Sequence, residues 1–224
     1  MKLSNTDTLN VHVADSEWTL HPEKAIFWEE EQLLIVTDIH LGKSGHFRKF
    51  GIAAPSAINK KNLNRLSALI LKYEPKELLI LGDLFHSEIN KDWLEFENWR
   101  KSFPDLEITL VTGNHDILHH SFYDAGQIQT VQVLNKGSFT FKHHHVTEPE
   151  SDTVVVSGHI HPAVKVKARG RQSIKVPCFL FKNNHVLLPA FGEFTGTHII
   201  KPDETDRIYG VVDNSIIKLN TQLP

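Results

Sequence analysis

The sequence contains almost no cysteine. Cys178 is the only one among 224 residues, which excludes an internal disulfide and a zinc site made of cysteine pairs. Long apolar stretches are also missing, since no run approaches the roughly 20 residues needed to span a bilayer. Residues 1–7 lack the apolar segment of a secretory signal. We therefore expect a soluble, cytoplasmic protein with no membrane partner.

The chain has no large excess of charge of one sign. Its net charge is −3 with the histidines neutral, so no overall basic field attracts nucleic acid, although a local basic patch is not excluded. The 40% hydrophobic and 23% charged content is ordinary for a globular protein. No low-complexity tract and no repeat of fixed period is found. This length and composition predict one domain over residues 1–224.

The periodicity of the apolar residues changes near residue 128. Before it, short buried strands alternate with two helices, which predicts parallel strands joined by helical crossovers. After it, short strands follow one another with hairpin turns. Because both halves carry polar clusters at strand ends, we expect one α/β domain with two packed sheets. The predicted strands lie at 11–13, 25–28, 33–37, 78–81, 108–111, 131–134, 139–141, 154–156, 165–167, 175–181, 186–188 and 209–212, the helices at 55–74 and 93–100, and an exposed loop at 201–206.

Four of the apolar strands run directly into residues that bind metals. Alternation along an extended chain places residues i and i+2 on one side, so Asp38 with His40, and His159 with His161, can each face one ion. Each motif alone is weak, because hydrogen-bonded turns and surface histidines are ordinary alternatives. Four strand ends together predict a metal cluster. The motifs are Asp38-Ile39-His40, Gly82-Asp83, Gly113-Asn114-His115-Asp116 and Gly158-His159-Ile160-His161.

Three adjacent histidines at 143–145 provide a fifth candidate ligand. Phe139 and Phe141 alternate on one side of a strand, and His143 continues that side, so it is the first choice. His144 points the other way and stays open as an alternative if the strand kinks at its end. The combined oxygen and nitrogen donors suit Mn²⁺, Fe²⁺ or Zn²⁺. Two such ions held about 3.5–4 Å apart can clamp both oxygens of a phosphoryl displacement.

The order Asp-x-His, Gly-Asp, Gly-Asn-His-Asp, His and Gly-His-x-His over residues 33–161 resembles the calcineurin-like metallophosphoesterases. Three more stretches, at 41–55, 82–87 and 188–196, are similar to the ligase-associated DNA damage response phosphoesterases. Those are endonucleases linked with a DNA ligase and a helicase. The resemblance implies an α/β (α+β) fold, namely a four-layer αββα sandwich of two mixed β-sheets flanked by helices.

The resemblance also implies two divalent ions, for which Mn²⁺ is expected and Fe²⁺ or Zn²⁺ stay open. Asp83 would bridge the two ions. The ligands of the first ion would be Asp38, His40, Asp83 and His161, and those of the second would be Asp83, Asn114, His143 and His159. Because the family has one histidine where this chain has three, the position of His143 among them stays open.

The roles of the catalytic residues come from the same resemblance, whereas the candidate substrate contacts, His86 and Arg48, are suggested by their positions next to the motifs. His115 would stabilise the phosphoryl oxygens or protonate the leaving alkoxide, and Asp116 would orient His115. His86 would either contact the substrate or hold the Asp83 side chain in position without binding the metal itself. Arg48 is suited to bidentate phosphate recognition, although a solvated basic loop explains it equally well.

Basic residues alternate just after the last histidine motif. Lys165, Lys167, Arg169 and Arg171 would lie on one face of a strand and could follow a nucleic-acid backbone. A charged edge strand that resists aggregation explains them at least as well.

These residues together predict a dinuclear metal-dependent phosphoesterase. We expect a phosphodiesterase or nuclease, in which a hydroxide shared by the two ions attacks phosphorus in line. The substrate would be a phosphate ester, DNA or RNA. The resemblance implies a role in DNA repair, with a DNA ligase and a helicase as partners. The alternatives are a phosphomonoesterase, a nucleotide or pyrophosphate hydrolase with the same centre, and a non-catalytic metal-binding interaction module. The oligomeric state stays open.

Overall fold

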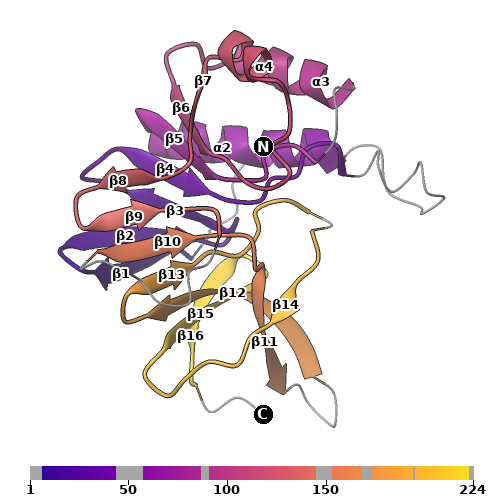
Figure 1. Cartoon of the computed structure of the whole chain (residues 1–224). Helices are drawn as coiled ribbons and strands as arrows, with labels where there is room; N and C mark the ends of the chain where they lie inside the picture. Colours follow the sequence, from indigo (N-terminus) through magenta and orange to yellow (C-terminus); the bar gives the residue numbers. More distant parts are fainter. Residues whose placement is uncertain are drawn as a thin grey trace.

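Two stacked β-sheets form the centre of the molecule, and helices lie over one of them (Figure 1). The computed structural model of the chain describes residues 7–43, 58–86, 91–144, 153–167, 173–193 and 195–221. Within these ranges, the first sheet has seven strands and the second has nine. Parallel and antiparallel pairs occur in both sheets. The predicted α/β fold with two mixed sheets is therefore confirmed.

The first sheet holds the parallel strands whose ends carry predicted ligands. Its strands follow chain order as β1 (Leu9–Val13), β2 (Ser16–His21), β3 (Ala25–Trp28), β4 (Leu33–Val36), β5 (Glu77–Leu81), β6 (Glu107–Val111) and β7 (Ile128–Val131). The pairs from β1 to β4 are antiparallel, and those from β4 to β7 are parallel. The carboxyl ends of β4, β5 and β6 therefore meet at one edge of the sheet.

The second sheet brings the later motifs to the same edge. Its strands are β8 (Leu134–Lys136), β9 (Phe139–Phe141), β10 (Val154–Ser157), β11 (Pro162–Lys167), β12 (Ser173–Lys182), β13 (His185–Leu187), β14 (His198–Ile199), β15 (Arg207–Val212) and β16 (Ser215–Leu219). They are ordered β14-β11-β12-β13-β10-β9-β8, and β15 with β16 joins β12. The central strands β9, β10 and β13 are parallel.

Apolar side chains alternate between two cores, which explains the unbroken apolar runs. Leu33 and Ile35 of β4 lie in the core between the sheets, together with Phe139 and Phe179 of the second sheet. Leu34, the residue between them, lies in the core under the helices. A strand covered on both faces needs apolar residues at every position. The buried strands predicted from such runs are therefore found.

The helices cover the outer face of the first sheet (Figure 1). They are α2 (Ile58–Tyr73), α3 (Lys91–Arg100) and α4 (His120–Ala125). Trp93 and Trp99 of α3 are buried in this core. In the segments that the structure describes, no helix is long and apolar enough to cross a membrane.

The outer face of the second sheet has its own small core. Val176, Cys178 and Leu180 of β12 lie in it, and Ile160 and Ile200 pack against them from loops. Within the described ranges, this face is closed by loops and strands rather than by a helix. The single cysteine is thus a buried apolar residue, and burial raises the pKa of its thiol to about 12.

The prediction of one strand over residues 131–134 is wrong. β7 ends at Val131 in the first sheet, and β8 begins at Leu134 in the second. The alternating run Val-Gln-Val-Leu resembles a single strand, but the chain must bend there because it passes from one sheet to the other. The strands β2, β14 and β16 and the short helix α4 lie outside the predicted elements.

Candidate metal centre

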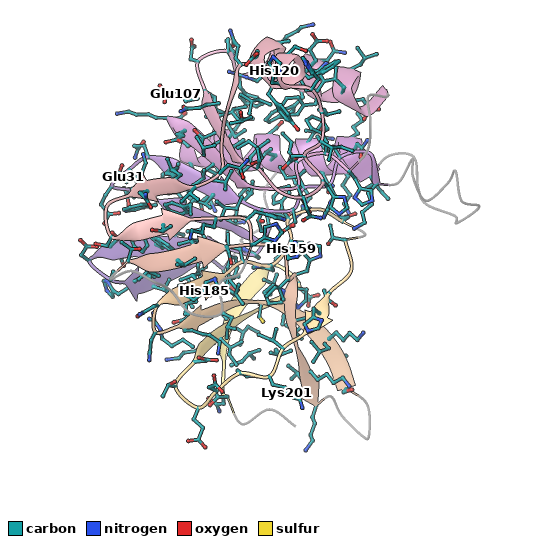
Figure 2. The ribbon with its side chains drawn as sticks, viewed as in Figure 1. Glu31, Glu107, His120, His159, His185 and Lys201 are labelled. Carbon is teal, nitrogen blue, oxygen red and sulfur yellow. The ribbon has the colours of Figure 1, made fainter. Side chains whose placement is uncertain are left out.

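The loops that follow β4, β5, β6, β9 and β10 meet at the edge shared by the two sheets. Their polar side chains converge from segments more than a hundred residues apart in the sequence, as the hydrogen bond from His159 N–H to Asp38 Oδ2 at 2.9 Å illustrates. Figure 2 places His159 between the helix-covered sheet and the strands of the lower part of the molecule. The predicted convergence of strand ends is therefore present.

Asp38, His40 and His161 form one group of converging donor atoms. Asp38 Oδ1 lies 3.2 Å from His161 Nε2 and 3.9 Å from His40 Nε2. This oxygen is buried and has no hydrogen-bond partner among the described residues. The other oxygen, Oδ2, accepts a hydrogen bond from the Thr37 hydroxyl at 2.6 Å. Because an unpaired buried carboxylate oxygen is costly, the group fits a divalent cation that completes it.

Asp83 lies between this group and a second one. Its Oδ2 is 3.6 Å from His40 Nε2, and its Oδ1 is 3.5 Å from His143 Nε2. Asp38, Asp83 and His143 also form a converging group of their own. A buried carboxylate with each oxygen facing a different imidazole is arranged to bridge two cations.

The second group contains His143, Asn114 and His159. His143 Nε2 lies 3.2 Å from Asn114 Oδ1 and 3.2 Å from His159 Nδ1. The other ring nitrogen of His143, Nδ1, is 2.8 Å from the carbonyl oxygen of Leu81. A carbonyl can only accept, so Nδ1 carries the proton and Nε2 is left as a ligand atom.

The structure separates two of the three adjacent histidines. His143 is buried and faces the carboxylates, whereas His144 is exposed and joins only a group with His143 and His159. The ring centroids of His144 and His159 lie 4.6 Å apart. His145 lies outside the described residues. Geometry therefore favours His143 as the ligand, as first expected.

Five of the seven predicted ligands have an unusual backbone conformation. The φ angle is +53° at Asp38, +50° at His40, +53° at Asp83, +65° at His159 and +54° at His161. Residues other than glycine rarely adopt this left-handed region, and such strain gathers at functional sites. The strands end at Val36 and Ser157, so left-handed turns, not strand alternation, turn these side chains toward one another.

Glycines bring backbone unusually close to the donor atoms. A Cβ added to Gly82 would lie 2.1 Å from His143 Nδ1, and one added to Gly113 would lie 2.3 Å from Asp83 Oδ1. At Gly158 it would lie 2.6 Å from Asp38 Oδ2. No side chain larger than hydrogen fits without moving a candidate ligand.

The charge states of the cluster suit cation binding. Burial acts to raise the pKa of Asp38, but the neighbouring His161 imidazole and the Thr37 hydroxyl outweigh it and hold that pKa below its usual value. Burial lowers the pKa of His40 to about 2. Burial, together with the neighbouring His143 and His144, also lowers the pKa of His159. Ionised carboxylates and neutral imidazoles are the forms that coordinate metals.

His115 and His86 lie beside the cluster. The His115 ring centroid is 5.4 Å from that of His40 and 4.5 Å from that of His86. His86 Nδ1 lies 3.2 Å from His40 Nδ1, which leaves His40 Nε2 directed at the carboxylates. Such a contact fixes the orientation of a ligand ring.

The Asp116 carboxylate accepts hydrogen bonds from backbone N–H groups rather than from the His115 ring. Its Oδ2 accepts hydrogen bonds from the N–H groups of Asp83 and Gly113, each at 2.8 Å, and its Oδ1 accepts from Leu84 at 2.9 Å and Phe85 at 3.3 Å. Burial and the charge of Asp83 raise the pKa of Asp116 to about 6, against these hydrogen bonds. The side chain thus fixes the left-handed turn at Asp83. Its predicted contact with the His115 ring stays a prediction.

Two positioning features lie outside the predicted metal-ligand motifs. The first is the segment after Leu188, where Phe191 N–H donates to Thr37 O at 2.8 Å and Gly192 N–H donates to Asp38 O at 3.0 Å. The second is Asn62 of α2, whose Nδ2 donates to Ile39 O at 3.3 Å. The sequence could have revealed Asn62, because it is a polar residue on the apolar face of the predicted helix.

Asn62→Ala is expected to lower the free energy of unfolding by about 1–3 kcal/mol, because the buried Ile39 carbonyl and the Glu193 N–H lose their partner. Urea denaturation measures the change. Asn64→Ala is the matched control, since Asn64 lies exposed on the same helix. An equal, small change in both variants would show that Asn62 does not hold the loop.

Some predicted residues cannot be placed at the centre. Arg48 lies outside the described residues, as do Arg169 and Arg171. The residues that the structure brings together are Asp38, His40, Asp83, His86, Asn114, His115, Asp116, His143, His159 and His161.

Comparison with known proteins agrees with this geometry. The family model described as calcineurin-like phosphoesterase matches residues 32–172. The crystal structure of Pseudomonas putida nuclease MPE is similar at 31% identity, with a TM-score of 0.79, and the match covers 92% of this chain and 97% of that one. Yfce, a phosphoesterase from E. coli, matches at 16% identity over 85% of this chain and 99% of that one, with a TM-score of 0.45. No curated protein sequence matches at a significant level. The chain therefore belongs to the calcineurin-like phosphoesterase family, whose members are metal-dependent phosphoester hydrolases.

Proposed function

We propose that this chain is a nuclease that hydrolyses DNA phosphodiesters at a centre of two divalent ions. The observation that carries the proposal is Asp83, whose two oxygens face different groups of donor atoms. The similarity to a nuclease at 31% identity over nearly the whole chain supports the choice of substrate.

The proposed ligands follow the two donor groups. Asp38, His40 and His161 hold one ion and Asn114, His143 and His159 hold the other, with Asp83 shared. When bound, the two ions supply an activated water and neutralise charge on the phosphate. Mn²⁺ is the proposed metal, and Fe²⁺ and Zn²⁺ accept the same donor set.

The remaining residues of the site either act on the substrate or hold the ligands in position. His115 lies beside the His40 ring, from where its imidazole stabilises the phosphoryl oxygens or gives a proton to the leaving alkoxide. Asp116 keeps the Asp83 turn in place through four backbone hydrogen bonds. His86 orients His40, and contact of His86 or Arg48 with substrate stays a prediction.

We extend the proposal to a role in DNA repair. It is supported by the similarity of residues 41–55, 82–87 and 188–196 to the ligase-associated DNA damage response phosphoesterases. Association with a DNA ligase and a helicase, and a cytoplasmic location, belong to the same proposal.

One comparison of substrates tests the function. The purified chain, reconstituted with Mn²⁺, Fe²⁺ or Zn²⁺ in turn, is assayed on single- and double-stranded DNA, RNA, bis(p-nitrophenyl) phosphate and p-nitrophenyl phosphate. We expect metal-dependent cleavage of DNA and of the diester, with the monoester slower by at least about tenfold. A preference for the monoester or for free nucleotides would replace the nuclease by the alternative hydrolases, and no turnover with any metal would contradict it altogether.

A further inference from the structure

A two-stranded ribbon begins at the metal centre. β11 starts at Pro162, directly after the candidate ligand His161, and pairs antiparallel with the first half of β12, from Ala163↔Pro177 to Lys167↔Ser173. Figure 1 shows β11 and this part of β12 extending away from the stacked sheets. β14 pairs only with Pro162 and Ala163. Beyond Ala163, the described residues thus form a ribbon of two strands.

One face of this ribbon carries three lysines and, among its described residues, no acidic side chain. Lys165 and Lys175 are exposed and lie directly opposite each other across the two strands. Lys167 lies on the same face of β11, because residues i and i+2 share a face. Like charges in directly opposite positions destabilise a strand pair. The sequence therefore keeps an unfavourable pair where an opposite pair would stabilise the ribbon.

These lysines have no acidic partner in the described part of the chain. Ion pairs hold Lys61 to Glu193, Lys136 to Glu31 and Glu77, and Lys182 to Asp203 and Asp206. None involves Lys165, Lys167 or Lys175. Since the whole chain carries a net charge of −3, the basic face is a local feature that a bound anion would complement.

The lysine face continues the face of β12 that packs against the first sheet. Along β12, Lys175 shares its face with Phe179 and Phe181, which lie in the core between the two sheets. The opposite face, with Val176 and Cys178, belongs to the outer core. Lys165 is the fourth residue after His161, which is roughly 13 Å along an extended strand. That span corresponds to about two nucleotides of an extended DNA backbone.

We propose that Lys165, Lys167 and Lys175 bind the phosphates of the DNA strand that leaves the metal centre. The ribbon would follow the backbone two to three nucleotides beyond the cleaved bond. This inference rests on the proposed nuclease function and adds the surface that favours a polynucleotide over a small diester.

Protection of an open strand edge is the competing explanation. Edge protection needs charge but does not need one sign, and alternating signs would protect equally while attracting each other. Lys165→Glu separates the two explanations. It keeps a charge at the edge and turns the Lys165–Lys175 pair into an attractive one, yet it repels phosphate.

The experiment uses the full chain reconstituted with metal. Lys165→Glu is compared with the parent and with Lys218→Glu, an exposed lysine of β16 that gives the same change in net charge. We expect Lys165→Glu to raise KM for a single-stranded oligonucleotide of about 30 nucleotides by about five- to tenfold near 0.1 M salt. The slope of log affinity against log salt should become shallower by about 0.7 for each phosphate that a lysine no longer neutralises. The rate on bis(p-nitrophenyl) phosphate and the melting temperature should not fall, and Lys218→Glu should match the parent.

Each outcome decides between the two proposals. If the parent cleaves DNA and Lys165→Glu has the same KM and salt slope as Lys218→Glu, the ribbon proposal is wrong and the nuclease stands. If the parent binds the oligonucleotide through the ribbon in fluorescence anisotropy but cleaves only other esters, the nuclease proposal alone fails. If Lys165→Glu also loses activity on the small diester or stability, the lysine is structural. Absence of both DNA binding and DNA cleavage overturns both proposals.

Discussion

Asp83→Asn is expected to lower phosphodiester turnover by about 10³-fold while the protein stays folded. Among the described residues, this carboxylate is the side chain whose oxygens face both donor groups, at 3.6 Å from His40 and 3.5 Å from His143. Asparagine keeps a single oxygen, which can still accept the hydrogen bond from His115 N–H. It loses the negative charge and the second oxygen that joins the two sites. Removing one preorganised hydrogen-bond donor from a catalytic centre typically costs about 10²–10³-fold, and the loss of a carboxylate shared by two metal sites should cost at least as much.

Metal content gives an independent readout for this variant. Elemental analysis of the parent should find about two ions per chain, and Asp83→Asn should hold one or fewer. Asp105→Asn is the control, because Asp105 is an exposed aspartate just before β6 and should change neither rate nor metal content. A fully metal-loaded Asp83→Asn protein that hydrolyses bis(p-nitrophenyl) phosphate at the parental rate would show that Asp83 does not bridge.

Sequence patterns predicted the buried part of this fold well. A run such as Leu33-Leu34-Ile35-Val36 leaves few alternatives to a strand covered on both faces, and β4 is found there. Elements with a weaker apolar pattern were not predicted. β2 has Trp18 and Leu20 alternating with polar residues and was still missed, and α4, with six residues, is too short to show a helical period.

The predicted ligands do converge, but the physical reason given for their convergence differs from the one that the structure shows. Strand alternation led to the expectation that Asp38 and His40 face one ion, and the two side chains do lie in one group of donor atoms. The strand, however, ends at Val36, and left-handed turns at both residues direct the side chains. Such turns are stabilised by distant groups, including the Asp116 carboxylate, which accepts the Asp83 N–H at 2.8 Å. No local pattern reveals a partner thirty-three residues away.

Gly82→Ala is expected to disturb the centre strongly, because the added methyl group meets both an unfavourable backbone conformation and a ligand ring. Gly82 has a φ of +78°, a conformation that costs an alanine about 1–2 kcal/mol. Its added Cβ would lie 2.1 Å from His143 Nδ1 and 2.4 Å from Cγ of the same ring. The ring cannot turn away freely, because Nδ1 is held by the Leu81 carbonyl. Overpacking of this kind costs a further 1–3 kcal/mol or so.

Gly196→Ala separates the two causes of that loss. Gly196 has nearly the same φ, +76°, but no atom lies within 4 Å of an added Cβ. Gly196→Ala should therefore lose only about 1–2 kcal/mol of unfolding free energy in urea, whereas Gly82→Ala should lose about 2–5 kcal/mol. Calorimetric titration with Mn²⁺ should show an affinity about 10- to 100-fold weaker in Gly82→Ala and unchanged in Gly196→Ala, because only the former displaces a ligand. Equal losses and equal metal affinities in both variants would mean that the position of the His143 ring does not determine metal binding.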